Sequence, residues 1–543
     1  MKSSLKSFLV PLLTLAPLAI SRSPNTLCST AILILLAWRL TTSLLHWLHP
    51  GGHAWGKYVS YRACERSSRS IIPGPRGVPF VGSMRLMSGL AHRRLDAVAR
   101  CLGAKRLMAI SLGDTRAVVA SHPDVAKEIL NGPSFSDRPH NHSAYGLMFH
   151  RSIGFAPYGA YWRTLRHIAA SHLFSPRQIE ASASHRLHVA TEVVSALRQL
   201  AIARKAVEIR GLLKRASLFF IMRSVFGKKY ELSTEAEAEV EELLGMVDEG
   251  YDLLGKRNWC DYFPLLAGLD LQHIQSRCSK LMPKVNRYVN SIIDEHRSTA
   301  GTETERSDFV AVLLSLQQSE GLSDADIAAV LWEMIFRGTD ATAVLMEWAL
   351  ARLVLHPDVQ AKVHAELDEV VGRSTPVNES HVPKLVYLQA VLKEVLRMHP
   401  PGPLLAWVRQ ATLDAEVDGH SVPAGTAAVV NMWAITHDAD VWPEPFEFRP
   451  ERFLAAGAGA DVVDQFSVLG GDARLAPFGS GKRSCPGKAM AMTAVGFWLA
   501  TLLHEYEWAS PSDAPSVDLS EVLRLSCEMA VPLEVVVRPR RVI

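Results

Sequence analysis

The chain has 543 residues, a formal net charge of +3 and 48% hydrophobic residues. This length is enough for a large core, and no basic stripe interleaved with aromatic residues supports nucleic-acid binding. The seven cysteines are irregularly spaced and form no CxxC pair, which argues against a zinc site and a disulfide framework and favours a reducing compartment.

Two apolar runs lie within the N-terminal region, residues 1–49. Residues 28–48 are about as long as the ~20 residues that a bilayer-spanning helix needs, so we expect a transmembrane anchor there, although Arg39 lies inside it. The alternative is a cleaved signal peptide over residues 8–20, but no small-residue cleavage site stands out after it. Basic residues are more frequent after the long run than before it, which favours a catalytic body in the cytosol.

Residues 50–82 are expected to form a basic linker that ends in a proline-rich hinge, IPGPRGVPFVG. One large domain, residues 83–543, follows it. Its pattern is mostly helical. A hairpin around Gly113-Asp114 is expected at 106–122, and short strands are expected at 415–425 and 533–540. The fold class predicted is therefore mainly α with small β-sheets.

Helical segments carry several polar side chains at helical spacing. Trp162 and Arg166 are four residues apart, and Glu394 and Arg397 are three apart, so each pair shares one helical face. The ordinary interpretation is an amphipathic helix in the first case and a surface ion pair in the second.

A long helix is expected from Asp324 to Leu355, with Ser323 as its N-cap and Asp326 three residues after the cap. In its middle lies RGTDATA, residues 337–343. Gly338 costs about 1 kcal/mol inside a helix relative to alanine, so its lack of a side chain must be useful. Asp340 either serves chemistry or pairs with Arg337 three residues earlier.

Cys485 lies in the stretch APFGSGKRSCPGKAMA, residues 476–491, and a long apolar helix follows it. The thiol is thus at or near a helix N-terminus, which stabilises a thiolate. Gly479, Gly481 and Gly487 allow tight turns that aim amides at the sulfur.

Three interpretations of this cysteine compete. A structural cysteine leaves the glycines unexplained, and a catalytic nucleophile needs a base that no signature supplies. A haem-thiolate ligand explains the glycines, the helix start and the basic neighbours, because haem carries two anionic propionates.

Phe478, Gly481, Arg483, Cys485 and Gly487 together resemble the ten-residue haem-binding signature of the cytochromes P-450. The resemblance runs from the proline hinge to the C-terminus. Segments 332–360 and 430–453 look most similar to plant subfamily seventy-eight A. The resemblance implies the cytochrome P-450 fold and haem b, iron protoporphyrin IX, held by an axial thiolate from Cys485.

Further residues acquire roles from the same resemblance. Arg483 is expected to contact a haem propionate and Phe478 to shield the sulfur. Other expected propionate donors are Trp162, Arg166 and Arg409. A buried structural cluster behind the cysteine loop is expected from Glu394, Arg397 and Arg452.

The long helix departs from the family pattern. The family usually has a threonine directly after the acid, for proton delivery to oxygen, but Ala341 stands there in this chain. Thr342 follows, turned by about 100° around the helix. We take Asp340 and Thr342 as the catalytic candidates, and expect a flat macrocycle and oxygen to lie against Gly338.

The function implied is that of a membrane-anchored monooxygenase, which inserts one oxygen atom from O₂ into a C–H bond of a lipophilic substrate. Electrons would come from NADPH through a separate reductase, at the endoplasmic reticulum membrane with the catalytic domain in the cytosol. Candidate substrates are a fatty acid or a derived growth signal, and the subfamily implies a role in plant organ or seed growth.

The substrate pocket is expected to be apolar, with parts of residues 145–155 and 526–529 contributing to it. Its other expected members are Phe336, Ala341, Leu404, Leu405 and Trp407. Two alternatives remain: a haem-thiolate isomerase or dehydratase that acts on peroxides without a reductase, and a non-enzymatic haem-binding protein.

Overall fold

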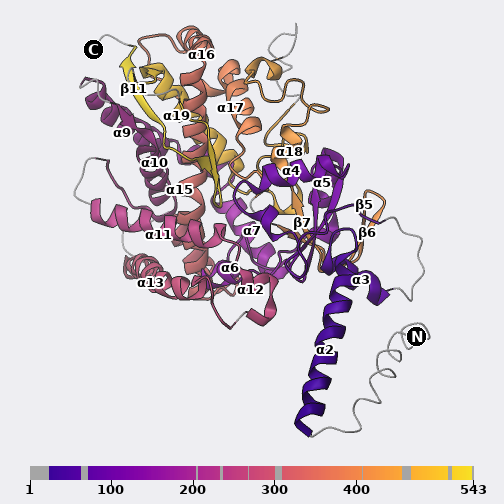
Figure 1. Ribbon diagram of the computed structural model, residues 1–543. Coiled ribbons are helices and arrows are strands. Elements are labelled where there is room, and N and C mark those ends of the chain that lie inside the picture. Colours follow the sequence, from indigo (N-terminus) through magenta and orange to yellow (C-terminus); the bar gives the residue numbers. More distant parts are fainter. Residues whose placement is uncertain are drawn as a thin grey trace.

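The computed structural model describes residues 24–62, 71–202, 206–232, 237–266, 268–299, 308–405, 408–454, 466–511 and 517–540. Within them the chain is mainly helical with small sheets, as the sequence predicts (Figure 1).

Helices make up most of the body. The first nine are α2 (Pro24–Trp47), α3 (His53–Arg62), α4 (Ala91–Cys101), α5 (Pro123–Asn131), α6 (His142–Gly146), α7 (Ala160–His172), α8 (Pro176–Ala181), α9 (Ala183–Ile202) and α10 (Ile209–Phe226). The next are α11 (Glu237–Gly255), α12 (Trp259–Tyr262), α13 (Ile274–Thr299), α14 (Phe309–Leu316), α15 (Asp324–Leu355), α16 (Pro357–Val370), α17 (Val386–Met398), α18 (Met432–Thr436) and α19 (Lys488–Glu505).

The strands are short. They are β1 (Leu107–Leu112), β2 (Thr115–Ala120), β3 (Val207–Glu208), β4 (Arg409–Gln410), β5 (Ala415–Val417), β6 (His420–Val422), β7 (Ala427–Val430), β8 (Tyr506–Ala509), β9 (Glu521–Leu523), β10 (Cys527–Met529) and β11 (Glu534–Pro539).

The largest sheet has the strand order β1-β2-β7-β4. Its β1–β2 pair is the antiparallel hairpin predicted at 106–122, and β2 pairs in parallel with β7, more than 300 residues later. The predicted strands at 415–425 form the β5–β6 hairpin, and those at 533–540 form β11, which pairs with β3 and β8.

The helix α15 runs through the middle of the body, with α10 and α11 beside it (Figure 1). It has the predicted bounds, and Ser323 caps it with Asp326 in a reciprocal capping box. Buried residues lie on every face of it, including Trp332 and Trp348, as expected of a helix enclosed by others.

Gly338 lies where α15 packs against α10. A Cβ at this position would lie 2.4 Å from the Ile221 side chain of α10. The missing side chain thus serves helix packing as well as the cavity described below, which Gly338 also lines. The sequence had led us to expect only the second role.

At the N-terminus, α2 projects from the body (Figure 1). Thr30–Trp47 is the one helical window among the described residues that is long and apolar enough to cross a membrane. The next helix, α3, belongs to the body: Trp55 is 4% exposed, and its indole N–H donates to the Ile110 carbonyl of β1 at 3.0 Å. Part of the predicted linker therefore packs on the sheet.

Candidate functional site

A cavity of about 300 Å³ lies inside the body. Its walls come from α7, α10, α15, the start of α19 and the cysteine loop. Residues far apart in the chain thus meet in one enclosed space, which is the usual setting of a cofactor or ligand site.

The cysteine loop forms one wall. Cys485 lines the cavity three residues before α19 begins, and its backbone N–H donates to the Phe478 carbonyl at 2.9 Å. Phe478 and Gly487 line the cavity as well. Gly481 does not line it; its role is in the turn, where φ is +66° and a Cβ would lie 2.2 Å from the Leu130 carbonyl oxygen.

Two opposing effects act on the pKa of the Cys485 thiol. Burial raises the pKa of the Cys485 thiol, whereas Arg337, the amide N–H of Gly487, Arg166 and Lys488 act to lower it. Such cations and amides stabilise the thiolate, which is the form that binds a metal.

Arginines are the main charged groups of the cavity wall. The five that line it are Arg138, Arg166, Arg337, Arg409 and Arg483, and Glu333 is the one carboxylate among the lining residues. Burial lowers the pKa of Arg409 to about 10, and the charge of Arg483 adds to this effect. Burial likewise lowers the pKa of Arg483 to about 10.

Three of these arginines also hold the backbone around the cysteine loop. Arg483 donates to the Ala156 carbonyl at 2.7 Å, and Arg409 donates to the Ser480 carbonyl at 3.0 Å. Arg138 donates to the Gly154 carbonyl at 3.1 Å. Three guanidinium groups gathered at this side of the cavity fit a bound dianion such as the two propionates of haem.

Trp162 lies on α7 in the same wall. Its indole N–H donates to the Ile153 carbonyl at 2.9 Å, and the Arg483 guanidinium lies 4.3 Å from its ring centre. Arg166, one turn later, lines the cavity too. The structure therefore brings together every residue that the resemblance proposed as a propionate donor.

The helix α15 forms another part of the cavity wall. Ala341 and Thr342 both line the cavity there, and so do Leu404 and Leu405 from the segment before β4. Trp407 lies outside the described residues. The two further segments that were expected to contribute, residues 145–155 and 526–529, also reach the cavity wall, through Ile153 and Gly154 and through Ser526.

Two expected cavity residues lie elsewhere. Phe336 is fully buried, with its ring centre 4.9 Å from that of Phe149 and 4.5 Å from that of Tyr251, and it is not a lining residue. Asp340 is not a lining residue either, and its carboxylate lies 3.2 Å from Lys214 Nζ of α10. The structure thus places the Phe336 ring in an aromatic cluster with Phe149 and Tyr251, and a role of Phe336 in substrate binding stays a prediction.

Glu333 is a site residue that the sequence did not reveal. Its carboxylate accepts the N–H groups of Ile153 and Gly154, both at 2.8 Å, and so ties that loop to α15. Burial raises its pKa, and the charge of Arg337 acts against this rise. The sequence did hold a signal for it, because Glu333 is an acidic residue between the apolar residues Trp332 and Met334. Arg138 and Arg337 were missed as cavity cations.

Glu394, Arg397 and Arg452 form the buried cluster expected behind the site. Arg397 Nε donates to Glu394 Oε2 at 2.8 Å, and Arg452 Nε donates to Glu394 Oε1 at 3.1 Å. Glu394 and Arg397 have no exposed side-chain surface. The cluster joins α17 to the 450–453 turn, which is a structural role.

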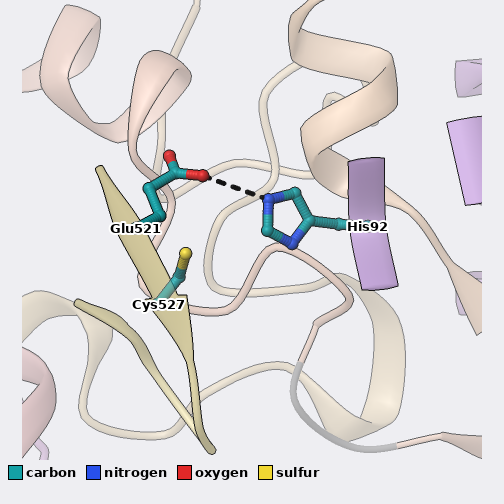
Figure 2. Close-up of side chains that lie close together, drawn as sticks. All are labelled: His92, Glu521 and Cys527. Carbon is teal, nitrogen blue, oxygen red and sulfur yellow. Dashed lines mark hydrogen bonds and ion pairs between the residues drawn. The ribbon is translucent and has the colours of Figure 1, made fainter. Parts of the chain in front are cut away.

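A second group of possible metal ligands is His92, Glu521 and Cys527, whose ligand atoms lie within 4.8 Å of one another (Figure 2). Arg93 Nε donates to Glu521 Oε2 at 2.9 Å. Burial acts to raise the pKa of Glu521, but contacts with His399, His92 and Arg93 outweigh it and lower the pKa. Burial holds the pKa of the Cys527 thiol well above its ordinary value. A protonated thiol and a carboxylate already paired with arginine favour an ion-pair cluster over a cation site.

Comparisons with known proteins agree with this geometry. The family model described as Cytochrome P-450 matches residues 72–528. Cytochrome P-450 78A9 of Arabidopsis thaliana is 60% identical over 503 residues, which are 92% of each chain. Cytochrome P-450 78A3 of Glycine max is 56% identical over 510 residues, 94% of this chain and 95% of that protein.

A more distant relative is the flavonoid 3'-monooxygenase of Arabidopsis thaliana, 34% identical over 89% of this chain and 94% of that protein. The matches cover the cysteine loop, the arginines and α15 together. The chain belongs to the cytochrome P-450 family of haem-thiolate monooxygenases and is similar to members of its subfamily 78A.

Proposed function

We propose that this protein is a membrane-anchored monooxygenase in which Cys485 is the axial ligand of haem b. The observation that carries the proposal is the placing of the Cys485 thiol and five arginines in the wall of one cavity. The thiolate would hold the iron, and Arg138, Arg409 and Arg483 would bind the propionates together with Trp162 and Arg166. When bound, the haem supplies the activation of O₂ by two electrons.

The rest of the wall would serve the substrate. Leu404, Leu405 and Ala341 give it an apolar surface, which favours a lipophilic molecule and keeps water away from the reacting C–H bond. Thr342 supplies the hydroxyl group of α15 that lines the cavity, and Asp340 lies two residues before it on the same helix. Both are proposed to serve proton delivery.

Three finer points belong to the same proposal. The anchor in α2 would hold the protein on the endoplasmic reticulum membrane, with the domain of residues 83–543 in the cytosol. NADPH would act through a separate reductase. The likeness to subfamily 78A supports a substrate that is a fatty acid or a derived growth signal, with a role in organ or seed growth.

Spectroscopy of the reduced protein with carbon monoxide tests the ligand. Wild type is expected to give the Soret band near 450 nm of thiolate ligation, and Cys485→Ala is expected to lack it. Turnover with reductase, NADPH and a fatty-acid panel tests the reaction, and products must carry oxygen from O₂. Peroxide conversion without NADPH would instead favour the isomerase or dehydratase alternative.

A further inference from the structure

Two histidines and an aspartate meet where the segment leading into α6 contacts α12 (Figure 1). They are His140, His142 and Asp261, and one nitrogen of each histidine lies within 4.8 Å of the other and of a carboxylate oxygen. His142 Nδ1 lies 2.6 Å from Asp261 Oδ1, and the two imidazole ring centres are 4.7 Å apart. Imidazole and carboxylate groups together are a ligand set that suits Zn²⁺ and related divalent metals.

Neighbouring contacts hold the carboxylate and one imidazole in place. Asp261 Oδ1 accepts the backbone N–H of His142 at 2.8 Å, and Asp261 Oδ2 accepts Asn141 Nδ2 at 3.3 Å. The His140 ring lies against Tyr145, with the ring centres 4.2 Å apart. Contacts of this kind orient metal ligands before the ion binds and so increase the affinity for it.

The charge balance of this group differs from that of the His92, Glu521 and Cys527 cluster. In that cluster Arg93 already pairs with the carboxylate. Over the residues that the structure describes, the contacts of Asp261 are to histidine and asparagine groups and include no lysine or arginine. The negative charge of Asp261 is therefore available to a metal cation.

An ion can reach the group from solvent. His140 is exposed and the His142 side chain is 43% exposed, whereas the Asp261 side chain is only 6% exposed. The carboxylate is thus the inner ligand, and the two imidazoles lie on the solvent side. Three protein ligands leave the fourth tetrahedral position of Zn²⁺ to a water molecule.

The two segments that this group connects lead to the cavity described above. The chain after α6 continues to Ile153 and Gly154, and the helix before α12 carries Tyr251; all three residues line the cavity. A metal ion would add coordination bonds to the hydrogen bonds at this junction. It would therefore restrict the movement of both segments.

We propose that His140, His142 and Asp261 form a binding site for one Zn²⁺ or a similar divalent transition metal, which joins the 140–142 segment to α12. Binding replaces the hydrogen bond between His142 and Asp261, and the proton of that bond leaves to solvent. None of the three residues lines the cavity. The inference therefore goes beyond the proposed function and does not depend on it.

Calorimetric titration with Zn²⁺ tests the inference. The full chain with its haem, in detergent and without a polyhistidine tag, is first treated with a chelator, which is then removed. Asp261→Asn keeps an oxygen that can accept N–H groups, and His140→Phe keeps an aromatic ring against Tyr145. We expect each substitution to weaken Zn²⁺ binding by about tenfold or more, since even residues that only orient a metal ligand contribute that much. His122→Asn is the matched control, because it removes another histidine beside an aspartate and keeps an N-cap for α5, and it should leave Zn²⁺ binding unchanged.

Hydrogen exchange gives a second measurement. Zn²⁺ is expected to slow amide exchange in residues 140–147 and 258–263 of wild type but not of Asp261→Asn, because the ion joins these segments. The inference is overturned if wild type binds Zn²⁺ no more tightly than both variants, or if Zn²⁺ leaves exchange in both segments unchanged. Mg²⁺ prefers oxygen ligands, so equally tight binding of Mg²⁺ would also overturn it. If Asp261→Asn fails to fold, His140→Phe still decides, because His140 is exposed.

Discussion

Gly481 shows how a single residue shapes the cysteine loop. Its φ is +66°, and a Cβ would lie 2.2 Å from the Leu130 carbonyl oxygen. Gly479 has a similar φ of +69°, but no atom lies within 4 Å of its Cβ position. Comparing an alanine substitution at each position therefore distinguishes the effect of backbone strain from the effect of a steric clash.

We expect Gly481→Ala to lower the free energy of unfolding by more than the ~1–2 kcal/mol that left-handed strain costs, and to reduce haem content. Gly479→Ala is the matched control for the free energy of unfolding alone, because Gly479 lines the cavity, and it should cost only that strain. Denaturant titration measures the first quantity, and absorbance per protein measures the second. Equal effects of the two substitutions would show that contact with Leu130 is unimportant.

Ala341 raises a question of proton delivery that the cavity makes testable. Ala341 and Thr342 both line the cavity, so either position can present a hydroxyl group to it. We expect Ala341→Thr to raise the yield of product per NADPH consumed, because it places a hydroxyl directly after Asp340. Thr342→Val should lower that yield if Thr342 now performs this role. The yield is measured as product formed against NADPH oxidised and peroxide released.

A yield that is unchanged or lower in Ala341→Thr would place the proton relay elsewhere. Lys214 is then the next residue to examine, since it connects Asp340 to Asp248 at distances of 3.2 Å and 3.1 Å.

At the scale of helices and strands, the buried Glu394 carboxylate connects α17 to the 450–453 turn. Glu394→Ala would leave the fully buried Arg397 without its carboxylate partner. We expect a loss of about 3–5 kcal/mol in the free energy of unfolding. Arg373→Ala removes an ion pair whose arginine is 79% exposed and should cost at most about 1 kcal/mol. A small loss for Glu394→Ala in denaturant titrations would contradict the structural role.

Local signals predicted the elements well. The capping pair Ser323 and Asp326 indicated where α15 begins, and the Gly113-Asp114 turn indicated the β1–β2 hairpin. The apolar run after Cys485 likewise predicted the start of α19. Each of these signals depends on residues that are close together in the sequence, so each can be read without the structure.

Contacts between distant elements could not be predicted in the same way. Lys214 is 126 positions from Asp340, and Gly338 meets Ile221 across a helix pair. The turn of α15 also directs Phe336 into an aromatic cluster with Phe149 rather than into the cavity. Such contacts depend on how the helices pack against one another, and the pattern of residues along a single sequence does not show which helices pack together.

At the scale of the whole molecule, the anchor and the body meet at α3. Ala54 N–H donates to Ser111 Oγ at 3.0 Å, and Trp55 is buried against β1. The helix α2 contacts the body at its C-terminal end: Trp47 Nε1 donates to the Gly77 carbonyl at 2.9 Å, and the ring centres of His46 and His53 lie 5.7 Å apart. If α2 is the membrane anchor that we propose, the folded body begins at α3.

Two truncations test this boundary. Removal of residues 1–48 should release the protein from membranes and lower the free energy of unfolding by less than the longer truncation does, because Trp55 and its contact with β1 stay in place. Removal of residues 1–70 also takes away Trp55, and we expect it to cost about 3–5 kcal/mol, as for truncation of a buried tryptophan. Trp55→Ala in the shorter truncation is the matched control and should account for most of the difference. Equal stability of the two truncated proteins would mean that α3 is part of the linker, and that the folded body begins at the proline-rich hinge.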